Sequence, residues 1–264
     1  MYRGIRQLLD EAFEGKPSKT AKFCTKGTAL ALSRGDDRPS LNLVPVVESI
    51  WKQLVTNWVE SGCCWSGEHN WRWTINPNLS VNKPNTSKEV TLNRTLARYL
   101  KEEYWANEIP TGSGLGKKGD KEPGGLDLAH SRGPRHVSLI ELKYDGENHG
   151  AENPVSAAFQ VVVYAQFLVL ARLIHKRFLL KNAPITIDKK WSDAKCADLI
   201  VLAPTSYYKR YLGLSWFEKR LNEATAAFGA RQGISMTFGF RSFDHDPTKE
   251  SELLHALEQR VKWD

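Results

Sequence analysis

The stretch GGLDLAHSRGPRHVSLIELKYD, residues 124–145, contains two apolar runs that predict neighbouring β-strands. A turn is predicted around Gly133, so the two strands can pair as a hairpin. Charge interrupts both runs, with Asp127 in the first and Glu141 and Lys143 in the second. An unpaired charge is costly to bury, so these side chains must find partners or a cation.

The spacing of the charges within the second run indicates a shared direction. Side chains alternate across a strand, so Glu141 and Lys143 project from one face and Leu142 from the other. Asp127 can add a second carboxylate from the preceding strand. Two carboxylates suit Mg²⁺, which takes oxygen ligands, keeps several waters and shares its shell with a substrate phosphate. The alternative is a surface ion-pair cluster at the ends of the strands.

Lysine beside such a cation has two chemical uses, and the sequence leaves both open. Lys143 either orients or deprotonates an attacking water, or it stabilises negative charge on a phosphate. Both uses require the ammonium to lie close to the metal.

The elements on either side of this stretch alternate between helical and extended patterns. Upstream, Thr86 or Ser87 can cap a helix that carries Glu89 in its first turn. Downstream, a long apolar helix from about Val155 to Lys176 precedes the short apolar run ADLIVLAP, 197–204, which favours a parallel crossover. Further helices are expected over 44–60, 216–229 and 249–263, and further strands over 71–75, 106–110 and 234–240.

The order of the charged residues resembles a known enzyme family. GGLD followed by IELK is similar to the PD-(D/E)xK nuclease superfamily, and closest in motif to RecB-like nucleases, with Asp127 and Glu141-Leu142-Lys143 as the motif. Gly125-Leu126 stands where the family's named pattern has a proline before the aspartate. The resemblance covers roughly residues 86–205.

The resemblance implies an α/β fold, a restriction-endonuclease-like core whose central mixed β-sheet is flanked by helices. We expect this nuclease-like domain to occupy residues 86–264, after a Trp-rich N-terminal extension over 1–85. The resemblance also implies the site. The expected metal ligands are Asp127, Glu141, Glu89 and the carbonyl group of Leu142, and the expected catalytic residues are Asp127, Glu141, Lys143, Glu89, Gln160 and Tyr164.

Three of these residues also have a simpler interpretation. Glu89 can be a first-turn glutamate that the helix dipole favours. Gln160 and Tyr164 are four residues apart, which places them on one face of a helix. RecB-like members carry this pair in the active site, but a hydrogen-bonded pair that satisfies a core gives the same pattern.

The activity implied by the resemblance is hydrolysis of phosphodiester bonds in DNA with Mg²⁺ or Mn²⁺, in phage defence, restriction or DNA repair. The alternative is a catalytically silent DNA-binding or partner subunit of a defence or repair complex. DNA is the expected partner, and a homodimer or a helicase or ATPase partner are further expectations. The formal net charge of +7 favours a polyanionic partner in general.

Other features limit the class of protein. Four cysteines, two of them adjacent, do not predict a disulfide framework, and we expect a cytoplasmic protein with no secretory signal and no membrane segment. The loop TGSGLGKKGDKEPGG, 111–125, lacks the spacing of a nucleotide-binding Walker loop and either contacts DNA phosphates or is a solvated turn. Trp65, Trp71 and Trp73 are expected to pack in the interior, with base stacking as the alternative.

Overall fold

The structure is a computed structural model. It describes residues 3–14, 29, 32–33, 41–60, 71–76, 87–111, 125–144, 153–179 and 187–263. Most of the loop over 111–125, and Trp65, lie outside the described residues.

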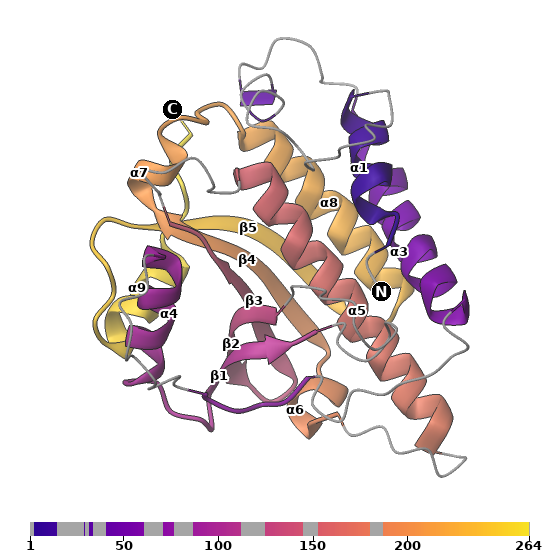
Figure 1. The fold of residues 1–264 in the computed structure, drawn as a ribbon, viewed down its shortest axis with the longest axis horizontal. Helices are drawn as coiled ribbons and strands as arrows, with labels where there is room; N and C mark the ends of the chain where they lie inside the picture. The colour runs from indigo at the N-terminus through magenta and orange to yellow at the C-terminus, as the bar shows by residue number, and fades with distance from the viewer. Residues whose placement is uncertain are drawn as a thin grey trace.

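A five-stranded mixed sheet forms the centre of the molecule, with the strands in sequence order (Figure 1). The strands are β1 (Trp105–Pro110), β2 (Gly125–Gly133), β3 (His136–Leu142), β4 (Cys196–Pro204) and β5 (Ser235–Phe243). Neighbours from β1 to β3 are antiparallel, and β3, β4 and β5 are parallel. The predicted hairpin is confirmed, and Gly133 adopts a φ of 146° where β2 turns into β3.

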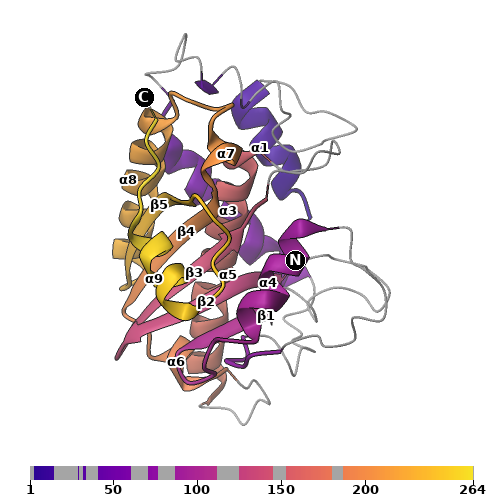
Figure 2. The same cartoon turned by 90° about the vertical axis from the view of Figure 1, so that its left-hand side faces the viewer.

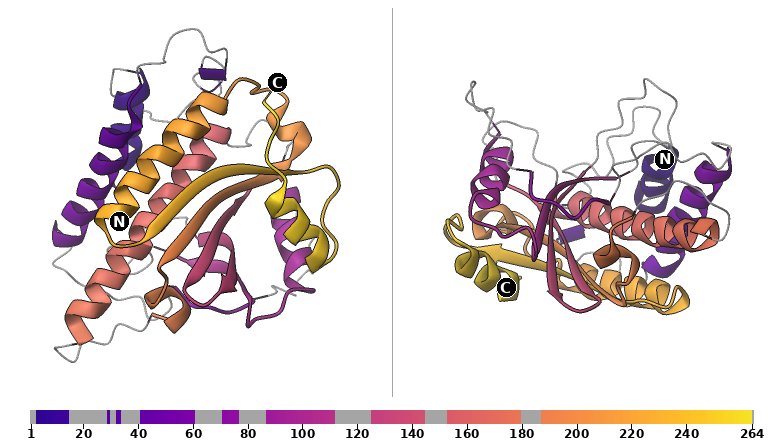
Figure 3. Two further views of the ribbon diagram at one scale, coloured as in Figure 1. Left: turned by 180° about the vertical axis from the view of Figure 1, so that it is seen from behind. Right: turned by 90° about the horizontal axis from the view of Figure 1, so that it is seen from below.

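Helices cover both faces of this sheet. They are α1 (Ile5–Glu14), α3 (Leu43–Glu60), α4 (Lys88–Ala97), α5 (Pro154–Leu179), α6 (Lys189–Ser192), α7 (Thr205–Tyr208), α8 (Ser215–Arg231) and α9 (Glu250–Glu258). One face carries α5 and α8, with α3 packed against both and α1 packed on α3 (Figure 3). The other face carries α4 and α9, which lie in front of the sheet in Figure 2. The mixed α/β architecture expected from the sequence is confirmed.

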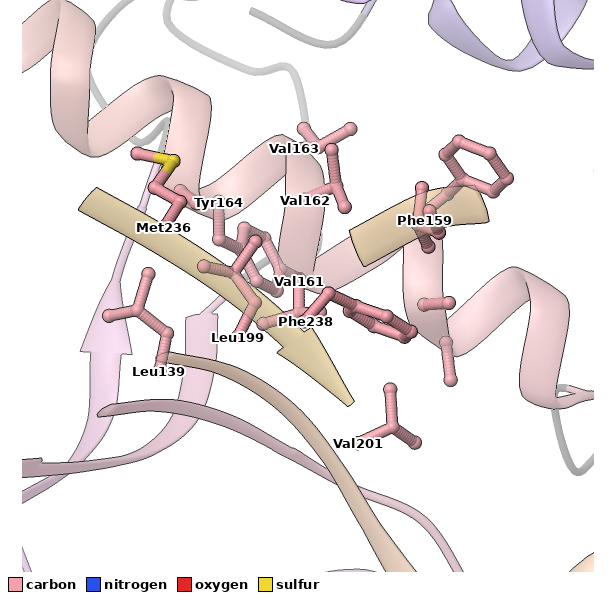
Figure 4. Packing of buried hydrophobic residues seen from close by; sticks show 14 of the residues in the cluster. Leu139, Phe159, Val161, Val162, Val163, Tyr164, Leu199, Val201, Met236 and Phe238 are labelled. Atoms are coloured by element: carbon pink, nitrogen blue, oxygen red, sulfur yellow. The ribbon is translucent and has the colours of Figure 1, made fainter. Parts of the chain in front are cut away.

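The helix α5 makes the crossover between the parallel strands β3 and β4. Its side chains fill the layer over the sheet, where Val161 lies with Leu199 and Phe238 (Figure 4). Within the described residues, Pro154–Lys176 is the segment long and apolar enough to cross a membrane. Of its most apolar 18-residue stretch, 89% is buried inside the structure. This burial is that of a core helix.

Residues of α3 belong to the same hydrophobic cluster as α5 and α8. The proposed domain boundary near residue 85 therefore stays a prediction, since the described part of the N-terminal region packs on the sheet-covering helices.

Two predicted elements differ from the structure. Residues 71–76 form no strand, although Trp71 N donates to Pro110 O and Asn107 N to Thr74 O, both at 3.2 Å. Trp71 has a φ of 57°, which interrupts an extended backbone.

The C-terminal helix is shorter than expected. It ends at Glu258, and the chain then follows β5, where Ser242 N donates to Gln259 O at 3.1 Å. Trp263 anchors this tail, because its Nε1 donates to Glu218 Oε2 at 2.7 Å. Tertiary contacts therefore override the helical pattern of the last residues.

The tryptophans of the N-terminal region pack in the interior wherever they are described. Trp71 and Trp73 both contact Trp191, with ring centroids 5.1 and 4.8 Å apart. Trp71 is fully buried, and Trp73 Nε1 donates to the carbonyl oxygen of Glu102 at 2.9 Å. The packing interpretation is confirmed for these two residues.

His130 makes the stability of this fold sensitive to acid. Its ring stacks on Trp105 at 4.2 Å, and burial is the main cause that lowers its pKa from 6.5 to about 4. Between these two pH values the unfolded chain binds a proton that the folded chain does not, so stability falls as the pH falls from 6.5 to 4. Below pH 4 both states are protonated and the loss stops growing.

We therefore expect His130→Phe to flatten the pH dependence of stability. The wild type should lose about 1 to 2 kcal/mol more than the variant between pH 6.5 and 4, a figure reduced for the partial solvent exposure of the ring. Urea unfolding at a series of pH values measures this difference. Parallel curves for the two proteins would contradict the assignment to His130.

Candidate functional site

The end of β3 holds a buried pair of opposite charges. Glu141 is 4% exposed and Lys143 is 5% exposed, and Lys143 Nζ donates to Glu141 Oε1 at 2.8 Å. Val137 and Leu139, earlier on β3, face the α5 layer, and strand alternation places Glu141 and Lys143 in the same direction. Leu142, between them, packs in the opposite layer under α4 and α9. The shared direction predicted from the sequence is thus present.

Asp127 lies beside this pair on the neighbouring strand. Its Oδ2 accepts a hydrogen bond from Leu142 N at 2.8 Å. Burial, followed by the negative charge of Glu141, raises the pKa of Asp127 well above its usual value, and Lys143 opposes this shift. The two carboxylates predicted to converge therefore do so closely enough to repel each other.

Glu89 approaches the same pair from α4. Ser87 caps this helix, since its Oγ accepts from Val90 N at 3.3 Å, and Glu89 therefore lies in the first turn. Its Oε1 is 3.7 Å from Lys143 Nζ, and its side chain is 33% exposed. The negative charge of Glu89 also raises the pKa of Asp127. Glu89 thus joins the cluster and connects it to solvent.

This carboxylate cluster is formed by Glu89, Asp127, Glu141 and Lys143. It contains three carboxylates and one ammonium, and the negative charges of Glu141 and Glu89 both raise the pKa of Asp127. Carboxylate oxygens are the ligands that Mg²⁺ and Mn²⁺ prefer, so the donor chemistry fits a hard divalent cation. Among the described residues, however, no group of three or more His, Cys, Asp or Glu side chains has the arrangement of a ready-made metal site.

The expected pair on α5 is divided between two environments. The Gln160 Oε1 atom is buried and accepts no hydrogen bond within the described part of the chain. Tyr164, one turn later, is 8% exposed and points into the apolar layer that also holds Leu199 and Met236 (Figure 4). Of these two residues, Gln160 has the polar atom still able to accept a bond, whereas the tyrosine ring belongs to the core.

Three residues around the cluster are absent from the sequence expectations. Tyr144 follows Lys143 directly, and its hydroxyl donates to Asp246 Oδ1 at 3.0 Å. The Lys88 ammonium lies 5.5 Å from the centre of the Tyr144 ring. These contacts join α4, β3 and the segment before α9. The sequence offers one signal for two of them, since Lys88 and Tyr144 are direct neighbours of Glu89 and Lys143 in the chain.

Comparison with protein-family models, with curated proteins and with solved structures gives no match for this chain. The function of this chain is therefore inferred from the chemistry of the carboxylate cluster.

Proposed function

We propose that the protein is a metal-dependent deoxyribonuclease with a restriction-endonuclease-like core, which hydrolyses phosphodiester bonds with Mg²⁺ or Mn²⁺. The observation that carries this proposal is the buried Glu141–Lys143 pair with Asp127 and Glu89 next to it. The order Asp127, Glu141, Lys143 and the antiparallel hairpin followed by a parallel crossover support the PD-(D/E)xK resemblance.

Stability gives no reason for such a cluster. A buried ion pair contributes little or nothing relative to well-packed apolar side chains, because desolvation offsets the attraction between the charges. The cluster is less favourable still, since Asp127 is repelled by Glu141 and Glu89. Groups that oppose folding in this way are typical of functional sites, where their charge serves a ligand or a reaction.

Each residue of the cluster has a role in the proposed hydrolysis. Asp127 and Glu141 would hold the divalent cation, with Glu89 and the Leu142 carbonyl group as further oxygen donors. When bound, the cation supplies positive charge that polarises the phosphate and activates water. Lys143 lies 2.8 Å from Glu141, so beside the proposed cation its positive charge would stabilise the negative charge that develops on the phosphate. Gln160 Oε1 could accept a hydrogen bond from water or substrate.

The second candidate is a DNA-binding or partner subunit that has lost turnover. One observation favours it: the described carboxylates have no ready-made metal-site arrangement. The intact set of Asp127, Glu141 and Lys143 favours the nuclease, because a silent subunit has no use for a buried charged cluster. DNA is the proposed substrate in both cases, and participation in defence, restriction or repair, a homodimer, and a helicase or ATPase partner are part of the same proposal.

Cleavage assays on supercoiled, linear and single-stranded DNA test the proposal. We expect cleavage with Mg²⁺ or Mn²⁺ and none with EDTA, because the phosphate charge is not neutralised without the cation. In the same assay Lys143→Met tests the site, and Lys219→Met is its control. Lys219 is an exposed residue of α8, and its loss also removes one positive charge, but from the surface. This control should cleave like the wild type. No cleavage of any substrate with either metal would favour the silent subunit.

A further inference from the structure

A buried network of asparagine side chains lies next to the carboxylate cluster and is hydrogen-bonded to the backbone of Asp127. Asn93 on α4 is 4% exposed and Asn107 on β1 is 2% exposed. Asn107 Nδ2 donates to Asn93 Oδ1 at 3.0 Å, and Asn93 Nδ2 donates to the backbone carbonyl oxygen of Asp127 at 3.3 Å. Leu92, Leu96 and Leu128 belong to the apolar layer around it. Amides are costly to bury in such a layer unless they are bonded, as these two are.

The network continues away from the cluster into the segment 71–76. Asn107 Oδ1 accepts from Asn76 N at 2.6 Å, and its own backbone N donates to Thr74 O at 3.2 Å. Asn107 therefore connects this segment to Asn93. The full chain of bonds joins four parts of the fold: the segment, β1, α4 and β2.

Asn93 is one helical turn after Glu89 on α4, so the two side chains occupy neighbouring places on one face of the helix. The same asparagine is bonded to the backbone of Asp127. The distance between the Glu89 and Asp127 carboxylates therefore depends on the bond that Asn93 makes.

Apolar packing alone does not fix this relation. Dispersion forces between the leucines of α4 and the sheet have no preferred direction, so they specify the position of the helix less sharply than a hydrogen bond does. A hydrogen bond between buried amides has a direction and a narrow range of length, so it specifies one position of the helix.

We propose that Asn93 is a positioning residue, which sets α4 so that Glu89 and Asp127 face the same cation. This inference rests on the proposed function. Asn93 touches neither substrate nor cation, and it acts through the Asp127 backbone and through the placement of Glu89.

The test is Asn93→Ala compared with Asn57→Ala. Asn57 is 8% exposed, and its Nδ2 donates to Arg3 O at 2.9 Å, so it is a buried asparagine with a similar backbone bond on α3, outside the cluster. We expect Asn93→Ala to lower kcat about 10- to 100-fold and to raise the Mg²⁺ concentration needed for half-maximal rate. Both variants should lose stability, but Asn57→Ala should keep the wild-type kcat and Mg²⁺ requirement.

Equal kcat values and Mg²⁺ requirements for the two variants would overturn the proposal, because a merely structural asparagine predicts that result. Circular dichroism confirms that each variant is folded at the assay temperature. If Asn93→Ala does not fold, Asn107→Ala takes its place, since it leaves Asn93 present but removes the bond to Asn93 Oδ1. We expect the same changes with smaller size, and unchanged kinetics would again overturn the proposal.

A second measurement separates this inference from the proposed function. Urea unfolding of Asn93→Ala, Glu89→Gln and the double variant requires no catalysis. If Asn93 places Glu89, the shift of the unfolding midpoint in the double variant departs from the sum of the single shifts. Additive shifts would overturn the positioning role. Absence of DNA cleavage by the wild type would instead overturn the proposed function.

Discussion

Replacing Lys143 with methionine is expected to lower the rate of DNA cleavage about 10²- to 10⁴-fold. The ammonium lies 2.8 Å from Glu141 Oε1 and is the cluster's own positive charge. Methionine keeps a long flexible side chain, so the substitution removes charge with little change in volume. Single-turnover cleavage at saturating Mg²⁺ measures the chemical step. A rate within a few-fold of the wild type would show that Lys143 has no catalytic role.

The same substitution should destabilise the protein in the absence of metal. Loss of the ammonium removes from Glu141, which is 4% exposed, the positive charge 2.8 Å from its Oε1, and breaking a buried pair in this way costs about 3 to 5 kcal/mol. Adding Glu141→Gln to Lys143→Met should recover much of this loss, because no buried charge then remains from the pair. Mg²⁺ should stabilise Lys143→Met more than the wild type, since it replaces the missing positive charge. These results distinguish a lost catalytic group from a misfolded protein.

The sequence alone is sufficient to predict the central hairpin and the crossover helix. The two charged runs around Gly133 and the long apolar helix after them have strong periodic patterns, and the structure places them as β2, β3 and α5. The convergence of Asp127 and Glu141 was also predictable, because strand alternation fixes the direction of each side chain.

The rest of the site depends on contacts between distant segments. Asn93 is a polar residue in the middle of a short helix, and nothing in the local sequence indicates that it bonds to a backbone carbonyl group 34 residues later. Tyr144 and Asp246 are 102 residues apart in the chain. The early end of α9 has the same origin, since the tail over 259–263 follows β5 in place of continuing a helix. Such long-range partners leave no periodic pattern.

Replacing Asp127 with asparagine is expected to abolish metal-dependent cleavage and at the same time to stabilise the metal-free protein at neutral pH. The pKa of Asp127 is raised by burial and by repulsion from Glu141 and Glu89. A raised pKa in the folded state means that the contribution to stability is complete below the unfolded value near 3.9 and is lost as the pH rises through the folded value. The ionised carboxylate therefore opposes folding at neutral pH.

Asparagine removes this opposition and keeps an oxygen that can accept the bond from Leu142 N. Each pH unit by which the pKa is raised corresponds to about 1.4 kcal/mol, and each kcal/mol to about 2 to 4 °C in Tm for a chain of this size. Thermal unfolding in EDTA at pH 7.5 should thus give a higher Tm for Asp127→Asn, by about 2 °C or more. The gain should disappear near pH 3, where the aspartate is protonated in both states.

Asp198→Asn is the matched control for this result. Asp198 on β4 allows the same substitution outside the cluster. Its carboxylate lies 2.8 Å from His136 Nε2 and accepts a hydrogen bond from Thr237 Oγ1 at 2.7 Å, so its loss should lower the Tm or leave it unchanged. Mg²⁺ should raise the Tm of the wild type and of Asp198→Asn, and raise that of Asp127→Asn much less. A lower Tm for Asp127→Asn in EDTA would mean that Asp127 is an ordinary structural carboxylate. A higher Tm for Asp127→Asn together with a lower Tm for Asp198→Asn would indicate that Asp127 is kept at a cost in stability, as expected for a ligand of a cation.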